Sequence, residues 1–159
     1  MRKILSILLE NEFGALSRVI GLFSQRGYNI ESVTVAPTQD PSISQMTIQT
    51  NVEDEKVIDQ IQKQLYKLIN VIQIKEIGSS PHITREIMLL KIQIDKDKRN
   101  DIIPITNTFK GKIVHFTNTI MIIQICGKTE KIMEYVSIIE KITKILEIAR
   151  SGLIGISKP

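Results

Sequence analysis

Hydrophobic and polar residues follow two different periods along the first half of the chain. Strand-like runs cover residues 3–9, 29–36, 43–50 and 71–77, and a turn with two prolines and an aspartate separates the second run from the third. Between the first two runs, apolar residues recur at the i, i+3, i+4 and i+7 spacing of an amphipathic helix: Leu16, Val19, Ile20 and Phe23. The pattern predicts a strand, a helix that Gly27 ends, and a hairpin.

A second amphipathic helix is predicted over residues 53–69, where the first turn is acidic. Its apolar positions follow the helical period: Ile58, Ile61, Leu65 and Leu68. Together with the strand over residues 71–77, this helix completes the order strand, helix, strand, strand, helix, strand. The following segment, GSSPH at residues 78–82, has the composition of a linker.

The same order of elements recurs beyond the linker, although the sequence itself does not repeat. The predicted strands cover residues 85–95, 112–117, 119–126 and 145–150, and the predicted helices cover residues 101–110 and 128–143. A proline breaks a helix interior, so we expect Asp101 to cap the first of these helices. Pro104 then lies in the first turn, where its missing N–H has no intrahelical partner to lose.

Two successive βαββαβ units predict an α+β fold with two tandem ferredoxin-like modules. We expect the modules to cover residues 1–77 and 84–159, with a linker at residues 78–83. Each module would have an antiparallel sheet with both helices on one face. Such a sheet leaves its other face and its edges uncovered, so we expect the chain to self-associate.

The composition indicates in which cellular compartment the protein is expected. The 159 residues are 42% hydrophobic and 24% charged, and no apolar run approaches the roughly 20 residues that span a bilayer. Glu10 and Glu12 interrupt the basic and apolar N-terminus, which favours a first strand over a signal peptide. The single cysteine, Cys126, excludes an internal disulfide, and its apolar neighbours predict a buried thiol. We therefore expect a cytoplasmic protein that binds no membrane.

The residues that usually carry catalysis are sparse. His82 and His115 have no carboxylate or cysteine at metal-ligand spacing, and the sequence contains no phosphate-binding glycine motif or nucleophile triad. The net charge of +4 is compatible with nucleic-acid binding, but aromatic residues make up only 4% of the chain, too few for base stacking on a sheet. We expect no catalytic site, no metal, no cofactor and no nucleic-acid partner in this chain.

The start of the first predicted helix offers a different chemistry. Unpaired N–H groups in a first helical turn attract a carboxylate, and a glycine lets a ligand approach the backbone closely. Neutral asparagine amides can bind both an ammonium group and a carboxylate. These are the needs of a free amino acid, and the candidate effector-binding residues are Asn11, Gly14, Ala15, Leu16, Asn29 and Ile30. The residues alone leave a structural alternative open, in which Asn11 caps the helix or forms a turn and Gly14 only eases a bend.

The segment from Asn11 to Ile30 resembles an ACT domain and, more narrowly, the regulatory (small) subunit of acetolactate synthase, also called acetohydroxyacid synthase. Further segments resemble the same family, so the resemblance covers essentially the whole chain: residues 32–38, 46–49, 85–91 and 149–152. The chain departs from the family pattern at Gln45, where an arginine is expected, and at Pro104 in the first helix of the second module.

The resemblance implies a regulatory role without an active site. Members of this family bind a large catalytic subunit that carries thiamine diphosphate, magnesium and FAD, raise its activity and confer feedback inhibition by valine. That enzyme condenses pyruvate with a second 2-keto acid, with loss of carbon dioxide, toward valine, leucine and isoleucine. The resemblance also implies a homodimer in which the effector lies between the two protomers. The helix-start residues of one protomer would then face Asn29 and Ile30 of the other. A free-standing ACT-type sensor that acts on another enzyme or on transcription is the alternative.

Overall fold

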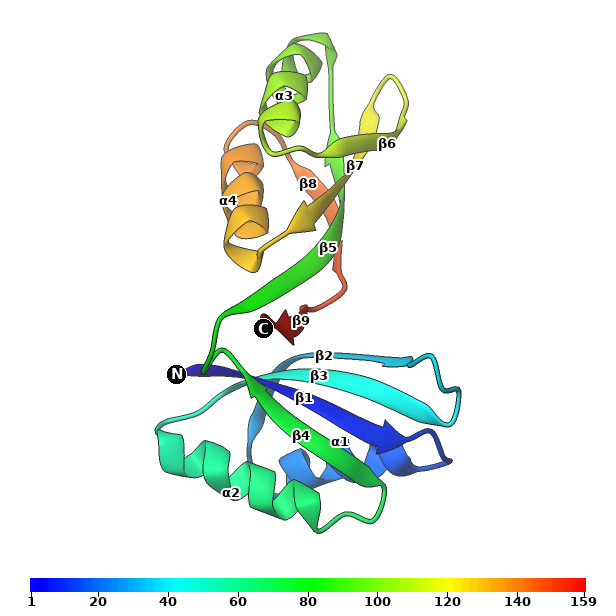
Figure 1. Cartoon of the computed structure of the whole chain (residues 1–159). Helices are drawn as coiled ribbons and strands as arrows, with labels where there is room; N and C mark the ends of the chain where they lie inside the picture. Colours follow the sequence, from blue (N-terminus) through cyan, green and yellow to red (C-terminus); the bar gives the residue numbers. More distant parts are fainter. The chain divides into compact units, whose positions relative to one another are not determined.

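The computed structural model describes all residues, 1–159, and divides them into two compact units (Figure 1). We call residues Met1–Ile83 and Leu153–Pro159 the first unit, and Thr84–Gly152 the second unit. The predicted α+β fold with two βαββαβ modules is confirmed. The domain limits 1–77, 78–83 and 84–159 stay a prediction; in the structure, the C-terminal segment Leu153–Pro159 groups with the first unit.

The first unit contains a four-stranded antiparallel sheet in the order β2-β3-β1-β4, with both helices on one face (Figure 1). Its elements are β1 (Arg2–Glu10), α1 (Ala15–Gln25), β2 (Asn29–Pro37), β3 (Ile43–Asn51), α2 (Glu55–Tyr66) and β4 (Val71–Ile77). Alternate strand residues such as Leu5 and Ile7 lie opposite Ile48 and Met46 and are fully buried. These residues form the core with the apolar faces of the helices.

The apolar stripe of α1 is rotated relative to the sequence prediction. The buried positions are Ala15, Val19 and Phe23, whereas Leu16 is exposed at the helix start. An i, i+4, i+8 stripe points toward the sheet here, so Leu16 lies at its edge. Gly27 ends the helix in the left-handed conformation at φ 70°, as predicted.

The second unit repeats this topology, with strand order β6-β7-β5-β8. Its elements are β5 (His82–Gln93), α3 (Lys96–Thr108), β6 (Lys112–Phe116), β7 (Ile120–Gly127), α4 (Thr129–Glu140) and β8 (Ile145–Arg150). The first two residues of β5, His82 and Ile83, belong to the first unit. Its core is rich in isoleucine and methionine and includes the fully buried Tyr135. A short additional strand, β9 (Ile154–Ser157), was not predicted; it pairs with β5, and the backbone N–H of Lys158 donates to the carbonyl of Pro81.

The predicted start of α3 at Asp101 is wrong. The N-cap is Asp95, whose carboxylate accepts a hydrogen bond of 2.8 Å from the N–H of Lys98. Pro104 therefore lies in the helix interior rather than in the first turn. The Pro104 side chain is exposed, so water can solvate the carbonyl that the missing N–H leaves without a partner.

The prediction of a buried Cys126 is also wrong. On β7, the buried face carries Met121, Ile123 and Ile125, and strand alternation places Cys126 on the opposite, exposed face. No helix has both the length and the apolar character that a membrane crossing requires. No group of three or more His, Cys, Asp or Glu side chains is arranged to hold a metal ion.

Candidate functional site

A cavity of about 200 Å³ lies in the first unit beside the start of α1. The end of β1 and the following loop form one side, the first turn of α1 forms a second, and the last part of β2 forms a third. Its lining residues are Leu9, Glu10, Asn11, Glu12, Ala15, Leu16, Val35, Ala36, Pro37 and Ser44. Three of the six predicted effector-binding residues, Asn11, Ala15 and Leu16, thus line one cavity.

Asn11 does not cap the helix. Its backbone N–H donates to the carbonyl of Ser42 at 2.7 Å, and its side-chain Nδ2 donates to the carbonyl of Pro41 at 3.0 Å. These bonds join the end of β1 to the turn between β2 and β3. The side-chain amide is thereby oriented, and its Oδ1 has no hydrogen-bond donor within the chain. An oriented acceptor at the cavity wall suits a ligand ammonium group.

Gly14 is the N-cap of α1 and has φ 83°, a left-handed conformation that favours glycine. It provides no side-chain cap, and the first turn contains no acidic residue. The N–H of Ala15 donates to the carbonyl of Glu12 at 3.2 Å, so this predicted anion-binding amide is already used. The N–H groups of Leu16 and Ser17 have no acceptor within the chain, so the positive end of the helix stays available to an anion.

A buried asparagine below this loop was missed by the sequence analysis. Asn70 is 4% exposed; its Oδ1 accepts a hydrogen bond of 2.6 Å from Nη1 of Arg18, and its Nδ2 donates to Glu10 at 3.4 Å and to Glu12 at 3.3 Å. The Arg18 guanidinium also lies beside Gly14, 3.7 Å from where a Cβ would be. One buried amide therefore holds a cation and two carboxylates around the helix start.

The structure does not bring Asn29 and Ile30 to this cavity within one protomer. They begin β2, whereas Val35, Ala36 and Pro37 at the end of β2 line the cavity. Eight strand steps of about 3.3 Å separate Asn29 from Pro37 by about 26 Å. The side chain of Asn29 is exposed, and Ile30 packs in part against the core. A β-bulge at Glu31 sets these two residues apart from the regular β2–β3 ladder.

Comparison with known proteins identifies the family. Residues 5–73 match the model of the AHAS small subunit-like ACT domain, and residues 85–159 match that of the small subunit of acetolactate synthase. The chain is 56% identical to the acetolactate synthase small subunit of Buchnera aphidicola subsp. Schizaphis graminum, over 99% of both chains. It is 54% identical to the acetolactate synthase isozyme 3 small subunit of Salmonella typhimurium, over 99% of this chain and 96% of that one. The chain belongs to the acetolactate synthase small-subunit family.

A solved structure supports the same assignment. The acetolactate synthase small subunit of Thermotoga maritima superposes with a TM-score of 0.89 at 31% identity, over 99% of this chain and 98% of that one. As a member of this family, the chain is a regulatory, non-catalytic subunit in branched-chain amino acid biosynthesis. Because the second unit also matches this family, the assignment covers both units and disfavours a free-standing ACT sensor.

Proposed function

We propose that this small subunit binds the large catalytic subunit of acetolactate synthase in the cytoplasm and confers feedback inhibition by valine. In this proposal, thiamine diphosphate, magnesium and FAD are bound by the large subunit, and this chain supplies no catalytic group. Similarity to acetolactate synthase small subunits along the whole chain supports the proposed association with the large catalytic subunit. The main support for a valine site in this chain is the cavity at the start of α1.

The groups around this cavity complement a zwitterion with a short aliphatic side chain. The free N–H groups of Leu16 and Ser17 suit a carboxylate, and the Arg18 guanidinium lies close to the same helix start. The Asn11 Oδ1 and the Glu12 carboxylate suit an ammonium group. The apolar lining, which includes Leu16, accommodates the branched side chain of valine.

The open edge of the first sheet supports a site shared between two copies of the chain. Strand β2 is an edge strand, and two edge strands related by a two-fold axis pair antiparallel. In that arrangement, the start of one β2 lies opposite the end of the other. Asn29 and Ile30 of the second copy then approach Val35–Pro37, beside the cavity. Val33 and Val35, exposed on β2, become buried in such a dimer.

A shared site explains how a small ligand can act on an assembly. Valine bound between two protomers favours one relative orientation of the pair, and coupling to the large subunit requires such a difference between states. Valine has about eight heavy atoms, and roughly 0.5–1 kcal/mol per atom gives millimolar to micromolar affinity. This range suits the sensing of a metabolite pool.

Co-expression of two variants that have each lost valine inhibition tests whether the site is shared between protomers. Asn11→Ala and Asn29→Ala, each alone, should abolish most of the valine inhibition of acetolactate formation by the enzyme reconstituted with the large subunit. Co-expression of the two variants produces mixed dimers, in which one site keeps both native asparagines. Valine inhibition should therefore return in part in the co-expressed sample.

Asn100→Ala, an exposed asparagine on α3 of the second unit, serves as the matched control and should leave the valine response unchanged. A co-expressed sample as insensitive to valine as each single variant contradicts a site shared between protomers. Full valine inhibition in both single variants contradicts the site itself. Lack of any change in activity on adding the wild-type chain to the large subunit contradicts the regulatory role.

A further inference from the structure

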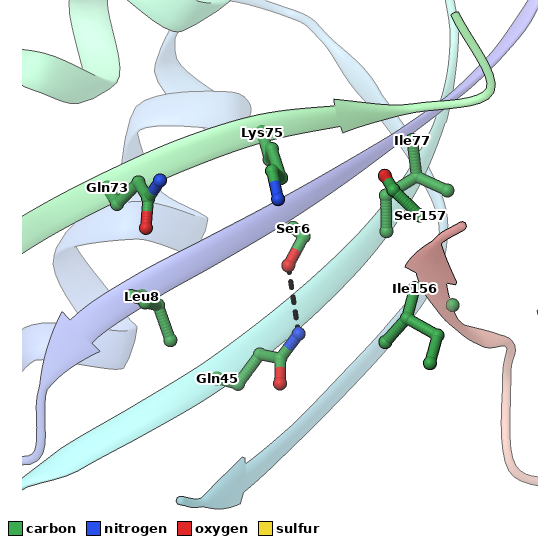
Figure 2. A pocket seen from close by; sticks show the side chains of 9 residues that line it. Ser6, Leu8, Gln45, Gln73, Lys75, Ile77, Ile156 and Ser157 are labelled. Atoms are coloured by element: carbon green, nitrogen blue, oxygen red, sulfur yellow. Dashed lines mark hydrogen bonds between the residues drawn. The ribbon is translucent and has the colours of Figure 1, made fainter. Parts of the chain in front are cut away.

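A second cavity lies on the helix-free face of the first sheet and belongs to no site described above. It has a volume of about 240 Å³ (Figure 2). Strands β1, β3 and β4 form its floor, and β9, from the C-terminal segment of the same unit, forms one wall. Its lining residues are Ser6, Leu8, Gln45, Gln73, Lys75, Ile77, Gly155, Ile156 and Ser157.

Strand register brings the polar residues of this cavity together. Ser6 on β1 lies directly opposite Lys75 on β4, and Leu8 lies between Gln45 on one side and Gln73 on the other. Directly opposite side chains on one face are close neighbours, about 5 Å apart at Cβ. Figure 2 shows the Lys75 ammonium group pointing toward Ser6. The cavity floor is therefore one continuous patch rather than a set of scattered side chains.

Lys75 is the single charged residue of this lining, and no carboxylate of the chain pairs with it. Lys3, on the same sheet, differs because it forms ion pairs with Glu55 at 2.6 Å and with Glu76 at 3.1 Å. The ammonium group of Lys75 thus has a positive charge that the protein leaves unneutralised. The charge complement of this cavity is one negative group.

The hydrogen bond between Ser6 and Gln45 determines which hydrogen-bond donor remains free for a ligand in this cavity. Gln45 Nε2 donates to Ser6 Oγ at 2.9 Å, which leaves the Ser6 hydroxyl proton free to donate (Figure 2). An anion held by Lys75 can accept this second hydrogen bond, because Ser6 lies directly opposite Lys75.

The volume of the cavity and its apolar lining residues limit the size and polarity of the rest of the ligand. Leu8, Ile77 and Ile156 flank the polar patch, and the volume is smaller than the 300–1,000 Å³ typical of drug-sized ligand sites. The lining contains no carboxylate, and its net charge is positive, so an ammonium group is disfavoured here. From this cavity we infer that the small subunit has a second binding site, specific for a short branched or linear aliphatic monocarboxylate that lacks an amine.

This site is distinct from the cavity at the start of α1. That cavity offers partners for both charges of an amino acid, whereas this one offers a partner for the carboxylate alone. Because β9 forms one wall, a bound carboxylate also stabilises the C-terminal segment on the first unit. Ligand binding here should therefore slow hydrogen exchange at residues 154–157.

Titration of the full isotope-labelled chain with sodium 3-methylbutanoate, followed by amide and side-chain NMR, tests the inference. The expected result is saturable shifts at Ser6, Gln45, Gln73 and Lys75, which an excess of valine does not reverse. The neutral analogue 3-methyl-1-butanol and the amine 3-methylbutylamine should produce no saturable shift at these residues. Shifts confined to other residues, or equal responses to the neutral analogue, overturn the inference.

Lys75→Gln removes the charge and should weaken 3-methylbutanoate binding by at least about tenfold, the loss expected for one charge-assisted hydrogen bond. Lys63→Gln, an exposed lysine on α2, is the matched control and should bind as the wild type does. Unchanged binding in Lys75→Gln overturns the inference. Valine inhibition of the reconstituted enzyme should persist in Lys75→Gln, which separates failure of this site from failure of the valine site.

Discussion

The two units share one strand order, but their first helices begin differently. In the first unit, α1 starts at Gly14, which has no side chain to cap the helix, and the N–H groups of Leu16 and Ser17 stay free beside a cavity. In the second unit, α3 starts at Asp95, whose carboxylate accepts the N–H of Lys98. An aspartate at the N-cap places a negative charge where a ligand carboxylate would bind.

The same contrast extends to buried polar groups. Glu86 in the second unit accepts hydrogen bonds of 2.6 Å and 3.1 Å from Arg150 and one of 2.8 Å from Thr129. Thr106 and Tyr135 share a buried hydrogen bond of 2.7 Å. These buried groups of the second unit have partners within the chain, although Arg99 Nε on α3 has none. The first unit instead leaves the N–H groups of Leu16 and Ser17 without an acceptor, beside a cavity. Substitutions should therefore change the effector response in the first unit and stability in the second.

The largest expected effect is on the valine response of Gly14→Asp. The new carboxylate lies beside the Arg18 guanidinium at the start of α1, and its charge repels the effector carboxylate. The valine concentration for half-inhibition should rise by at least about tenfold, while activation of the large subunit persists. Gly78→Asp, another glycine at positive φ but on the far edge of the sheet, should leave the valine response unchanged. Equal responses of the two variants to valine would contradict this prediction.

The second prediction concerns the stability of the second unit. Glu86→Gln leaves the Arg150 guanidinium without its carboxylate partner, and the Glu86 side chain is only 1% exposed. The free energy of unfolding, measured by urea denaturation, should fall by about 2 kcal/mol, a value reduced because Arg150 is partly exposed. Glu147→Gln, which removes an exposed pair with Lys91, should cost less than about 0.5 kcal/mol. Neither substitution should alter valine inhibition.

The same carboxylate predicts an acid dependence. Burial alone raises the pKa of Glu86, but the hydrogen bonds from Arg150 and Thr129, together with the charge of Arg150, outweigh burial and hold the pKa below its ordinary value of 4.5. The unfolded chain therefore binds this proton first as the pH falls. The stabilisation is complete above pH 4.5 and is lost as the pH falls through the lower, folded-state pKa. Denaturation at several pH values should show the difference between wild type and Glu86→Gln shrinking in acid; a constant difference contradicts the prediction.

A smaller loss is expected for Thr106→Val. The buried Tyr135 hydroxyl, whose pKa burial raises to about 12, loses its hydrogen-bond partner. Thermal or urea unfolding should show a loss of about 1–2 kcal/mol. Thr108→Val on the same helix removes only an exposed hydroxyl that donates to the carbonyl of Pro104, and should be nearly neutral. If Thr108→Val costs as much, the buried pair is not the cause.

The smallest expected change in stability is that of Asp95→Ala, which tests where α3 begins. Asp95→Ala should destabilise the chain by about 1 kcal/mol, because the N–H of Lys98 loses its side-chain acceptor. Asp101→Ala changes an exposed residue inside the helix, where alanine has the higher helix propensity, and should cost nothing. Greater destabilisation by Asp101→Ala would restore the helix start that the sequence predicts.

The sequence could predict features that neighbouring residues determine. Strands β4 and β8 have the predicted bounds, 71–77 and 145–150, and Gly27 ends α1 as predicted. The buried positions of α2, Ile58, Ile61 and Leu65, follow the helical period. Asn11 and Leu16 lie at one cavity because they are close in the chain. Periodicity and turn chemistry act over a few residues, so they can be read along the sequence.

Only the tertiary structure decided the contacts that join distant segments. The placement of Asn70 between Arg18 and Glu10, the exposed face of Cys126 and the pairing of β9 all depend on packing and strand register. The Ala15 amide, which the sequence leaves free, is taken up by Glu12 through the loop geometry. By itself, the sequence determined two βαββαβ modules and their family, and it left open whether Asn11 caps the first helix. The tertiary structure decided which polar groups stay without partners, because that depends on what packing brings within hydrogen-bond distance.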